Sequence, residues 1–157
     1  MPKTSIPDLV NNAKISLNVQ SENKKDVLKQ LIQLFEINEE QKDLLYNSVL
    51  QREEMGSTGI GKGIAIPHTR SMVVTDIMIA IGCLDKPLDF NSIDGKPVRL
   101  IFLIVAPPYG SNRKYLILLG KIAETFQEIS ADKNLFTTTD VESFKDELCK
   151  LFENKDE

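Results

Sequence analysis

Apolar and polar positions repeat along the chain with two different periods, which predict strands and helices in turn. Residues 15–19 alternate with a period of two and predict a short, half-buried strand. Apolar residues at helical spacing over residues 27–35 predict a helix, which Ser21 can cap. Asn38 with Gln41 has the spacing of a capping box and predicts a second helix.

The middle of the chain predicts turns and strands. Residues 56–63 are rich in glycine, so we expect a flexible turn region where the second helix fades. A short strand should follow and stop at Pro67, because proline lacks the amide donor that a continuing ladder needs. The apolar runs 77–83 and 98–105 predict two strands joined by a turn at 94–97, and the second should be buried on both faces.

The last third of the chain predicts helices. Ser111 or Asn112 can cap a long helix whose apolar positions extend over residues 115–126. A short helical turn is expected after it. Thr139 with Glu142 has the spacing of a capping box and predicts the last helix.

This order of elements predicts an α/β fold in which helices flank a mixed parallel and antiparallel sheet. A chain of 157 residues, of which 41% are hydrophobic, is long enough for one hydrophobic core. We therefore expect a single domain over residues 1–157, with residues 153–157 as a frayed tail. The order of the strands within the sheet does not follow from the sequence.

Charge and composition argue against several classes of protein. Lysine and arginine total 19 against 23 acidic residues, and the net charge of -4 argues against direct binding to nucleic acid. The longest apolar run, residues 100–108, is about half of what a membrane-spanning helix needs. Cys83 and Cys149 lie far apart in apolar surroundings, which indicates buried thiols in a reducing cytoplasm.

His68 is the single histidine and the strongest candidate for chemistry. It ends an apolar segment that follows the glycine-rich turn, and a neutral imidazole is abundant and nucleophilic near pH 7. The amide groups of a loop formed by Thr58, Gly59, Gly61 and Gly63 could surround an incoming phosphoryl group. A lone histidine beside a loop is also commonly a solvated or hydrogen-bonded surface residue, so both interpretations stay open.

Three cations lie close to His68 in the sequence and could add positive charge: Arg52, Lys62 and Arg70. Residues 56–62 match the Walker A spacing up to its lysine, but a glycine follows where serine or threonine should hold magnesium. The loop also follows a helical pattern and opens a strand, which is the reverse of a phosphate-binding loop. Nucleotide hydrolysis is therefore not favoured. With one histidine and two remote cysteines, we expect no metal site, and we expect no cofactor.

The run Arg52-Glu-x-x-Gly-Ser-Thr-Gly-x-Gly-x-Gly-Ile-Ala-Ile-Pro-His68 has a specific pattern, and three further segments support it: 90–98, 106–107 and 116–123. Together they resemble the enzyme IIA domain of the bacterial phosphoenolpyruvate:sugar phosphotransferase system. The fructose/mannitol type is closest, in particular its stand-alone nitrogen-regulatory IIA proteins. The resemblance covers nearly the whole chain and implies a phosphotransferase/anion-transport-protein-like fold.

The resemblance implies that His68 accepts a phosphoryl group from the phosphohistidine of the carrier protein HPr or its nitrogen-branch relative. Arg52 matches an arginine near the family's site and would stabilise the phosphate. Tyr115 stands where the family usually has a second histidine. Its hydroxyl can donate one hydrogen bond but cannot become a cation. A purely structural role for Tyr115, as an aromatic residue at the rim of the core, is an equal alternative.

Three functions follow from these observations. The first is a phosphotransferase component that acts as a regulatory phosphocarrier, because the glycine-rich motif is close to the nitrogen-regulatory branch and we expect no IIB or membrane IIC segment. The second is a sugar-specific IIA subunit of the fructose or mannitol class, which passes phosphate to a cysteine of a separate IIB domain. The third is a binding module that is not phosphorylated. The expected partners are the phosphocarrier and either a IIB domain or regulatory targets, without membrane insertion.

Overall fold

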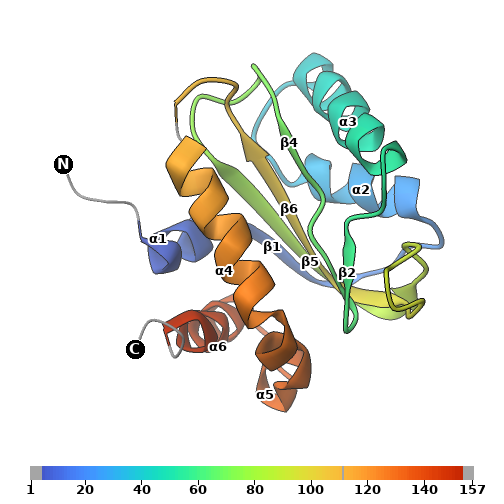
Figure 1. Ribbon diagram of the computed structural model, residues 1–157, viewed down its shortest axis with the longest axis vertical. Coiled ribbons are helices and arrows are strands. Elements are labelled where there is room, and N and C mark those ends of the chain that lie inside the picture. Colours follow the sequence, from blue (N-terminus) through green and yellow to red (C-terminus); the bar gives the residue numbers. More distant parts are fainter. Residues whose placement is uncertain (1–4, 111, 154–157) are drawn as a thin grey trace.

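A mixed β-sheet runs through the middle of the molecule and separates two layers of helices (Figure 1). The computed structural model describes residues 5–110 and 112–153. Its strands are β1 (Lys14–Val19), β2 (Gly59–Gly61), β3 (Ile64–Ala65), β4 (His68–Arg70), β5 (Met78–Leu88) and β6 (Val98–Ala106). Their order in the sheet is β1-β5-β6-β3-β2, and β4 also pairs with β6.

The strand directions are mixed, as the sequence predicts. β5 and β6 form the antiparallel centre of the sheet, and β1 lies parallel to β5. β3 and β4 both lie parallel to β6 and pair with successive parts of it. β2 and β3 form an antiparallel hairpin at one edge. This arrangement brings the segment that contains the histidine directly beside the central strand.

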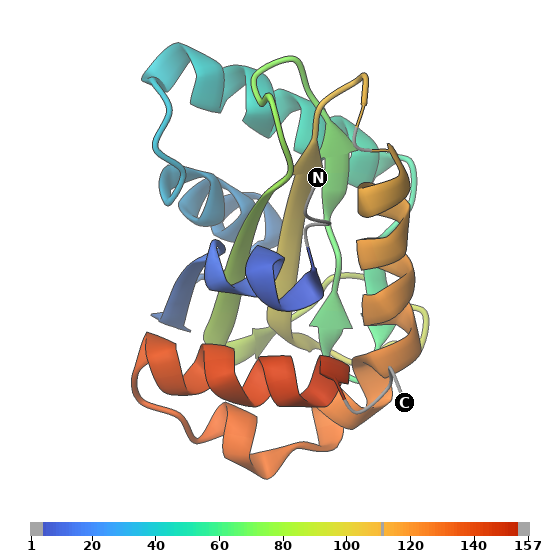
Figure 2. The ribbon, with the colours of Figure 1, turned by 90° about the vertical axis from the view of Figure 1, so that its left-hand side faces the viewer.

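Two groups of helices cover the two faces of the sheet. The helices are α1 (Ile6–Asn11), α2 (Lys24–Gln33), α3 (Glu39–Glu54), α4 (Asn112–Ala131), α5 (Lys133–Phe136) and α6 (Val141–Glu153). α2 and α3 pack on one face, whereas α1, α4, α5 and α6 pack on the other (Figure 2). Within the described residues, no helix is both long enough and apolar enough to span a bilayer.

The central strand β6 is buried on both faces, which confirms the prediction from its apolar sequence. Leu100, Phe102 and Ile104 pack in the cluster that includes α4 and α6. Ile101 and Leu103 pack in the cluster that includes α2 and α3. Because successive side chains of a strand point to opposite faces, one apolar run contributes to two cores at once.

The predicted helix caps are confirmed in one case and wrong in another. Asn38 and Gln41 form the expected capping box at the start of α3. Ser21 does not cap α2, because Asn23 accepts the hydrogen bond from the Asp26 amide instead. The Ser21 hydroxyl lies outside the helix and donates to the Asp26 carboxylate at 2.7 Å. A chain with several polar residues before a helix offers several caps, and spacing alone does not choose among them.

The cap of the last helix is also displaced by one residue from the predicted Thr139. Asp140 accepts from the amide of Ser143 at 2.9 Å and from its hydroxyl at 2.8 Å. Ser111, a candidate cap for α4, lies outside the described residues, and Asn112 is the first residue of that helix. Of the predicted tail, residue 153 ends α6, and residues 154–157 lie outside the described part of the chain.

Three short elements were not predicted: α1, β2 and β4. The expectation that the short strand stops at Pro67 is confirmed, since β3 ends at Ala65, but pairing with β6 resumes after the proline. The Pro67 carbonyl accepts from the Ile104 amide at 2.9 Å, and β4 continues along β6. Proline lacks a donor but keeps its acceptor, and a strand that pairs through alternate residues can tolerate it.

Candidate active site

The candidate site is built around the first residue of β4. His68 pairs with Ile104 of β6, and its side chain is half-buried. Its Nδ1 lies 2.7 Å from the Ile66 carbonyl oxygen. Because a carbonyl oxygen only accepts, Nδ1 carries the proton and Nε2 carries the lone pair of the neutral ring. Among the described residues, this is the one hydrogen bond that the imidazole makes, so Nε2 is the nitrogen that can act as a nucleophile.

Tyr115 lies on the first turns of α4 and faces the imidazole. The centroids of the His68 and Tyr115 rings are 6.2 Å apart, and the ring planes are inclined by 60°. Burial raises the pKa of the Tyr115 phenol, and the charges of Arg70 and Arg52 lower it in part. The hydroxyl therefore stays protonated near neutral pH and is a hydrogen-bond donor.

The two arginines predicted near the site are brought towards the same point. Arg70 ends β4, and its guanidinium carbon lies 4.8 Å from the centroid of the Tyr115 ring. Arg52 lies in the last turn of α3 and donates from Nη1 to the Gly56 carbonyl at 2.9 Å. Since both charges act on the Tyr115 phenol, both contribute to the potential around the imidazole.

The glycine hairpin does not surround the imidazole with the predicted amide groups. Lys62 and Gly63 have φ values of 57° and 81°, which is typical of a two-residue hairpin turn between β2 and β3. The Gly63 carbonyl accepts from Arg99 and Leu100, near the start of β6. Gly61, Lys62 and Gly63 therefore lie towards the opposite end of β6 from the partner of His68. The motif is rich in glycine because this turn needs positive φ.

Thr58 and Gly59 lie closer to the site, but their amide groups have partners. The Thr58 amide donates to the Glu53 carboxylate at 2.9 Å, and the Gly59 amide donates to the Ser57 hydroxyl at 3.0 Å. The carbonyl of Thr58 accepts from the Ile66 amide at 2.9 Å. Thr58 therefore positions the peptide that orients His68, which is a different role from the phosphate binding predicted for it.

A buried carboxylate that the sequence analysis missed supports this loop. The side chain of Glu53 is 2% exposed and accepts from the amide and hydroxyl of Thr58. It also pairs with Lys24 at 3.0 Å, and Lys24 donates in turn to the Phe90 carbonyl. The signal in the sequence was a glutamate beside Arg52 at the end of a helix, but charge patterning predicts an exposed side chain at such a position.

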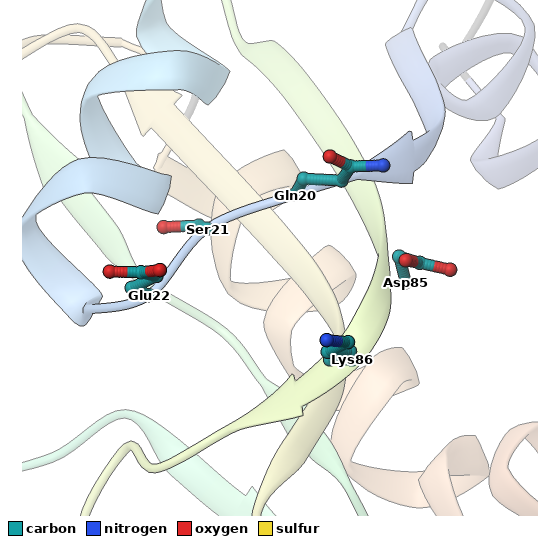
Figure 3. A pocket seen from close by; sticks show the side chains of 5 residues that line it. All are labelled: Gln20, Ser21, Glu22, Asp85 and Lys86. Carbon is teal, nitrogen blue, oxygen red and sulfur yellow. The ribbon is translucent and has the colours of Figure 1, made fainter.

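The pocket in Figure 3 lies away from these residues. It has a volume of about 330 Å³ and is lined by Gln20, Ser21, Glu22, Asp85 and Lys86. The lining side chains come from the segment after β1 and from β5. Asp85 and Lys86 follow Cys83, which pairs with Leu100, whereas His68 pairs with Ile104. The pocket is therefore at the other end of the sheet and is not part of the candidate site.

Comparison with known proteins identifies the family. Residues 8–154 match the family described as "Phosphoenolpyruvate-dependent sugar phosphotransferase system, EIIA 2". The chain belongs to this family. The match confirms the resemblance that the sequence motifs predict, and it makes the chain an EIIA-type component of the phosphotransferase system.

Two of its relatives match along most of their length. A "Nitrogen regulatory protein" of Bradyrhizobium diazoefficiens is 33% identical over 139 residues, which are 88% of this chain and 90% of that protein. The crystal structure of nitrogen regulatory protein IIA-Ntr from Neisseria meningitidis has a TM-score of 0.77 at 28% identity, covering 94% of this chain and 98% of that chain. This similarity confirms the predicted fold class.

A third relative is a longer protein. The "PTS system fructose-specific EIIABC component" of Bacillus subtilis is 32% identical over 134 residues, which are 83% of this chain and 21% of that protein. This chain therefore corresponds to about a fifth of the Bacillus protein and to most of the two nitrogen regulatory relatives.

Proposed function

We propose that the chain is a regulatory phosphocarrier in which His68 accepts a phosphoryl group from an HPr-type phosphohistidine protein. The observation that carries the proposal is the hydrogen bond from Nδ1 of His68 to the Ile66 carbonyl. It holds the ring in one tautomer, with Nε2 free to attack phosphorus. An oriented neutral nucleophile removes much of the entropic cost of the transfer.

The proposed step transfers one phosphoryl group between two imidazoles. Nε2 of His68 attacks the phosphorus in line, and the bond between phosphorus and the carrier's nitrogen breaks as the new bond forms. The carrier's nitrogen recovers its lone pair. The proton stays on Nδ1, so the product ring is positively charged beside the Ile66 carbonyl oxygen. Arg52 would stabilise the negative charge on the phosphoryl oxygens, as electrostatic stabilisation dominates such transfers.

Exposed apolar side chains that lie close in the sequence to residues of the site support docking of a carrier protein. Met55, Met72 and Leu116 are 81%, 86% and 62% exposed. Each lies within three residues of a charged or aromatic residue of the site. Apolar groups that surround a reactive centre are typical of a surface that a protein partner covers. An HPr-type protein that presents a phosphohistidine would bury them as it docks.

A regulatory role is the version of this function that the relatives favour. Two relatives that match along most of their length have nitrogen regulatory names. We therefore propose that a partner protein distinguishes the phosphorylated from the unphosphorylated state of His68. Phosphorylation adds charge and acceptor oxygens at an exposed apolar surface, which changes the affinity for any protein that binds there.

The test is mass spectrometry after incubation of the protein with phosphoenolpyruvate, enzyme I and HPr. The expected result is a mass increase of one phosphoryl group that is lost in acid. The increase should be absent in His68→Ala and present in the neighbouring variant Thr69→Ala. A protein that gains no phosphoryl group under conditions in which HPr is phosphorylated would contradict the proposal and favour a binding module.

A second candidate function is a fructose-class IIA subunit, which the similarity to the Bacillus fructose component favours. In that case His68 would pass its phosphoryl group to a cysteine of a IIB domain. Mixing the phosphorylated protein with purified IIB domains distinguishes the two roles. Rapid and stoichiometric transfer to one IIB domain would establish the sugar-specific role in place of the regulatory one.

A further inference from the structure

We propose that Arg70, positioned by the Tyr115 ring, binds the phosphoryl group carried by His68. The inference rests on the proposed function and adds a second cation to its site. It also explains how a site can work with tyrosine where the family usually has a second histidine. The permanent positive charge is that of the Arg70 guanidinium, and Arg70 belongs to β4, the strand that also holds His68.

The geometry of β4 directs both side chains to the same side. His68 and Arg70 are the first and last residues of this strand. Side chains two residues apart in a strand project from the same face, roughly 6.6 Å apart along the chain. The pairing of His68 with Ile104 and of Arg70 with Ala106 holds both positions against the central strand. The nucleophile and the guanidinium are therefore mounted on one rigid element.

Tyr115, on α4, places its ring against both the His68 and the Arg70 side chains. It is 5% exposed and lies between α4 and the sheet, so its ring is held by packing. The imidazole of His68 lies against this ring with centroids 6.2 Å apart, and the Arg70 guanidinium carbon lies 4.8 Å from the ring centroid. Stacking on an aromatic face orients the planar guanidinium and limits the entropy that it loses when it binds an anion.

The contacts of Arg70 leave most of its donors available. Its Nη1 donates to the Pro107 carbonyl at 3.2 Å. A guanidinium has five N–H donors, so this bond and the stacking hold the group while other donors remain free. Over residues 5–110 and 112–153, no carboxylate forms an ion pair with Arg70. An uncompensated guanidinium beside a nucleophile favours an incoming dianion.

The charge of Arg70 differs from that of a second histidine in its response to pH. An imidazole loses its charge near pH 6.5, whereas a guanidinium stays charged throughout the physiological range. Tyr115 contributes a neutral hydroxyl donor, because burial keeps its pKa above the usual value. The pair therefore supplies one permanent charge and one donor, and its contribution should not decrease as the pH rises from 6 to 8.

The experiment compares initial rates of phosphorylation by phospho-HPr in full-length variants. Arg70→Gln should lower the rate by about tenfold, which is less than the loss of a donor in a water-excluded site because the Arg70 side chain is exposed. Arg70→Lys should recover part of the rate, because it restores the charge without the planar fork. The phosphorylation rate of Arg70→His should approach that of Arg70→Gln as the pH rises from 6 to 8, because the introduced imidazole loses its charge in this range. The hydrolysis rate of each phosphoprotein gives a readout that does not depend on docking.

Arg99 provides a matched control at the other end of β6. Its guanidinium carbon lies 3.7 Å from the Phe136 ring centroid, and it donates to the Ser130 carbonyl at 2.6 Å. Arg99→Gln therefore removes one charge and one arginine–aromatic contact far from His68, and its phosphorylation rate should equal that of the unmodified protein. Tyr115→Ala should slow the reaction at least as much as Arg70→Gln, because it removes the hydroxyl donor and leaves the guanidinium unpositioned. The double variant should be no slower than Tyr115→Ala, because the positioning of Arg70 is already lost there.

The outcomes separate this inference from the proposed function. If the unmodified protein is phosphorylated and Arg70→Gln reacts at the same rate, Arg70 has no role at the phosphoryl group and the inference is wrong. An equal loss in Arg99→Gln would also overturn it, since net charge would then explain the effect. If the unmodified protein is not phosphorylated at all, the proposed function itself fails.

Discussion

The carboxylate of Glu53 accepts hydrogen bonds from both the amide and the hydroxyl of Thr58, five residues later in the chain. This contact begins a continuous series. The Thr58 carbonyl accepts from the Ile66 amide, and the Ile66 carbonyl accepts from Nδ1 of His68. Lys24 pairs with the same carboxylate at 3.0 Å from α2. Hydrogen bonds therefore link the imidazole to a partly buried ion pair that lies outside the site.

The first prediction concerns that carboxylate. Glu53→Ala should lower the free energy of unfolding by roughly 3 kcal/mol, because it leaves the Lys24 ammonium without its buried partner. Glu53→Gln should lower the free energy of unfolding by a smaller amount, since the amide oxygen of glutamine can still accept a hydrogen bond from Thr58. Chemical denaturation measures both changes.

Loss of the Glu53 carboxylate should also change the tautomer of the His68 imidazole, and NMR of the ring nitrogens can detect this change. In Glu53→Ala the population of the Nδ1–H tautomer of His68 should decrease. Glu54 is exposed and next in the chain, so Glu54→Ala is the matched control and should change neither stability nor tautomer. An unchanged tautomer in a folded Glu53→Ala protein would show that Ile66 is positioned by the sheet alone.

The second prediction concerns the exposed apolar side chains beside the site. Met72→Glu places a charge on the surface proposed to be covered by the carrier, where burial of an unpaired charge is costly. The KM for phospho-HPr should rise several-fold while the rate at saturation changes little. Steady-state kinetics of phosphorylation measures both constants.

Ile93 allows a matched control for Met72. It is 87% exposed, and it lies in the loop beside Asp94, near the glycine hairpin and away from His68. Ile93→Glu should leave the KM for phospho-HPr unchanged. A similar increase in both variants would indicate a general effect of added negative charge, and no increase in Met72→Glu would place the carrier on another surface.

Most of the fold could be predicted because its signals are periodic and local. The run at 98–105 is apolar without interruption, and it forms a strand buried on both faces, as predicted. The capping box at Asn38 fixes the start of α3 for the same local reason. β4 could not be predicted, because its three residues pair only through contact with a strand more than thirty residues later.

The site could be predicted in its residue types but not in its supporting contacts. His68 is identified by chemistry, and the two arginines by their nearness in the sequence. The sequence did not show where the glycines lie, because a hairpin turn and a phosphate-binding loop both need positive φ. The buried state of Glu53 depends on Lys24, 29 residues earlier, and pairwise contacts at that separation leave no pattern in a single sequence.

The third prediction concerns Gly59, where the structure explains the glycine by close packing. A Cβ atom added there would overlap the Ser92 side chain and lie 3.1 Å from its Cα. Gly59→Ala should therefore destabilise the protein by about 1–3 kcal/mol, as overpacking usually does. Thermal denaturation measures the change.

Gly120 is the control for this substitution. A Cβ at Gly120, within α4, would meet no atom within 4 Å. Gly120→Ala should therefore stabilise the protein by up to about 1 kcal/mol, since alanine favours a helix. If Gly59→Ala were as stable as the unmodified protein, Ser92 would have moved without cost, and close packing would not explain the glycine.

The fourth prediction concerns pH and the thiol of Cys83. Burial raises its pKa to about 12, and the nearby charge of Arg99 opposes this effect only in part. In the unfolded chain the thiol should ionise near pH 8.5. Because the folded pKa is the higher one, the neutral thiol contributes stability that is complete below about pH 8.5 and is lost as the pH rises towards 12.

Two measurements check this behaviour. Denaturation between pH 8 and 10 should show a decrease in stability that is smaller in Cys83→Ser, because serine does not ionise in this range. Alkylation at pH 8.5 should modify Cys83 much more slowly in the folded protein than in denaturant, since the thiolate is the reactive form. A Cys149→Ser background isolates the signal. Equal alkylation rates in the folded and unfolded states would mean that the thiol is reached by water and ionises normally.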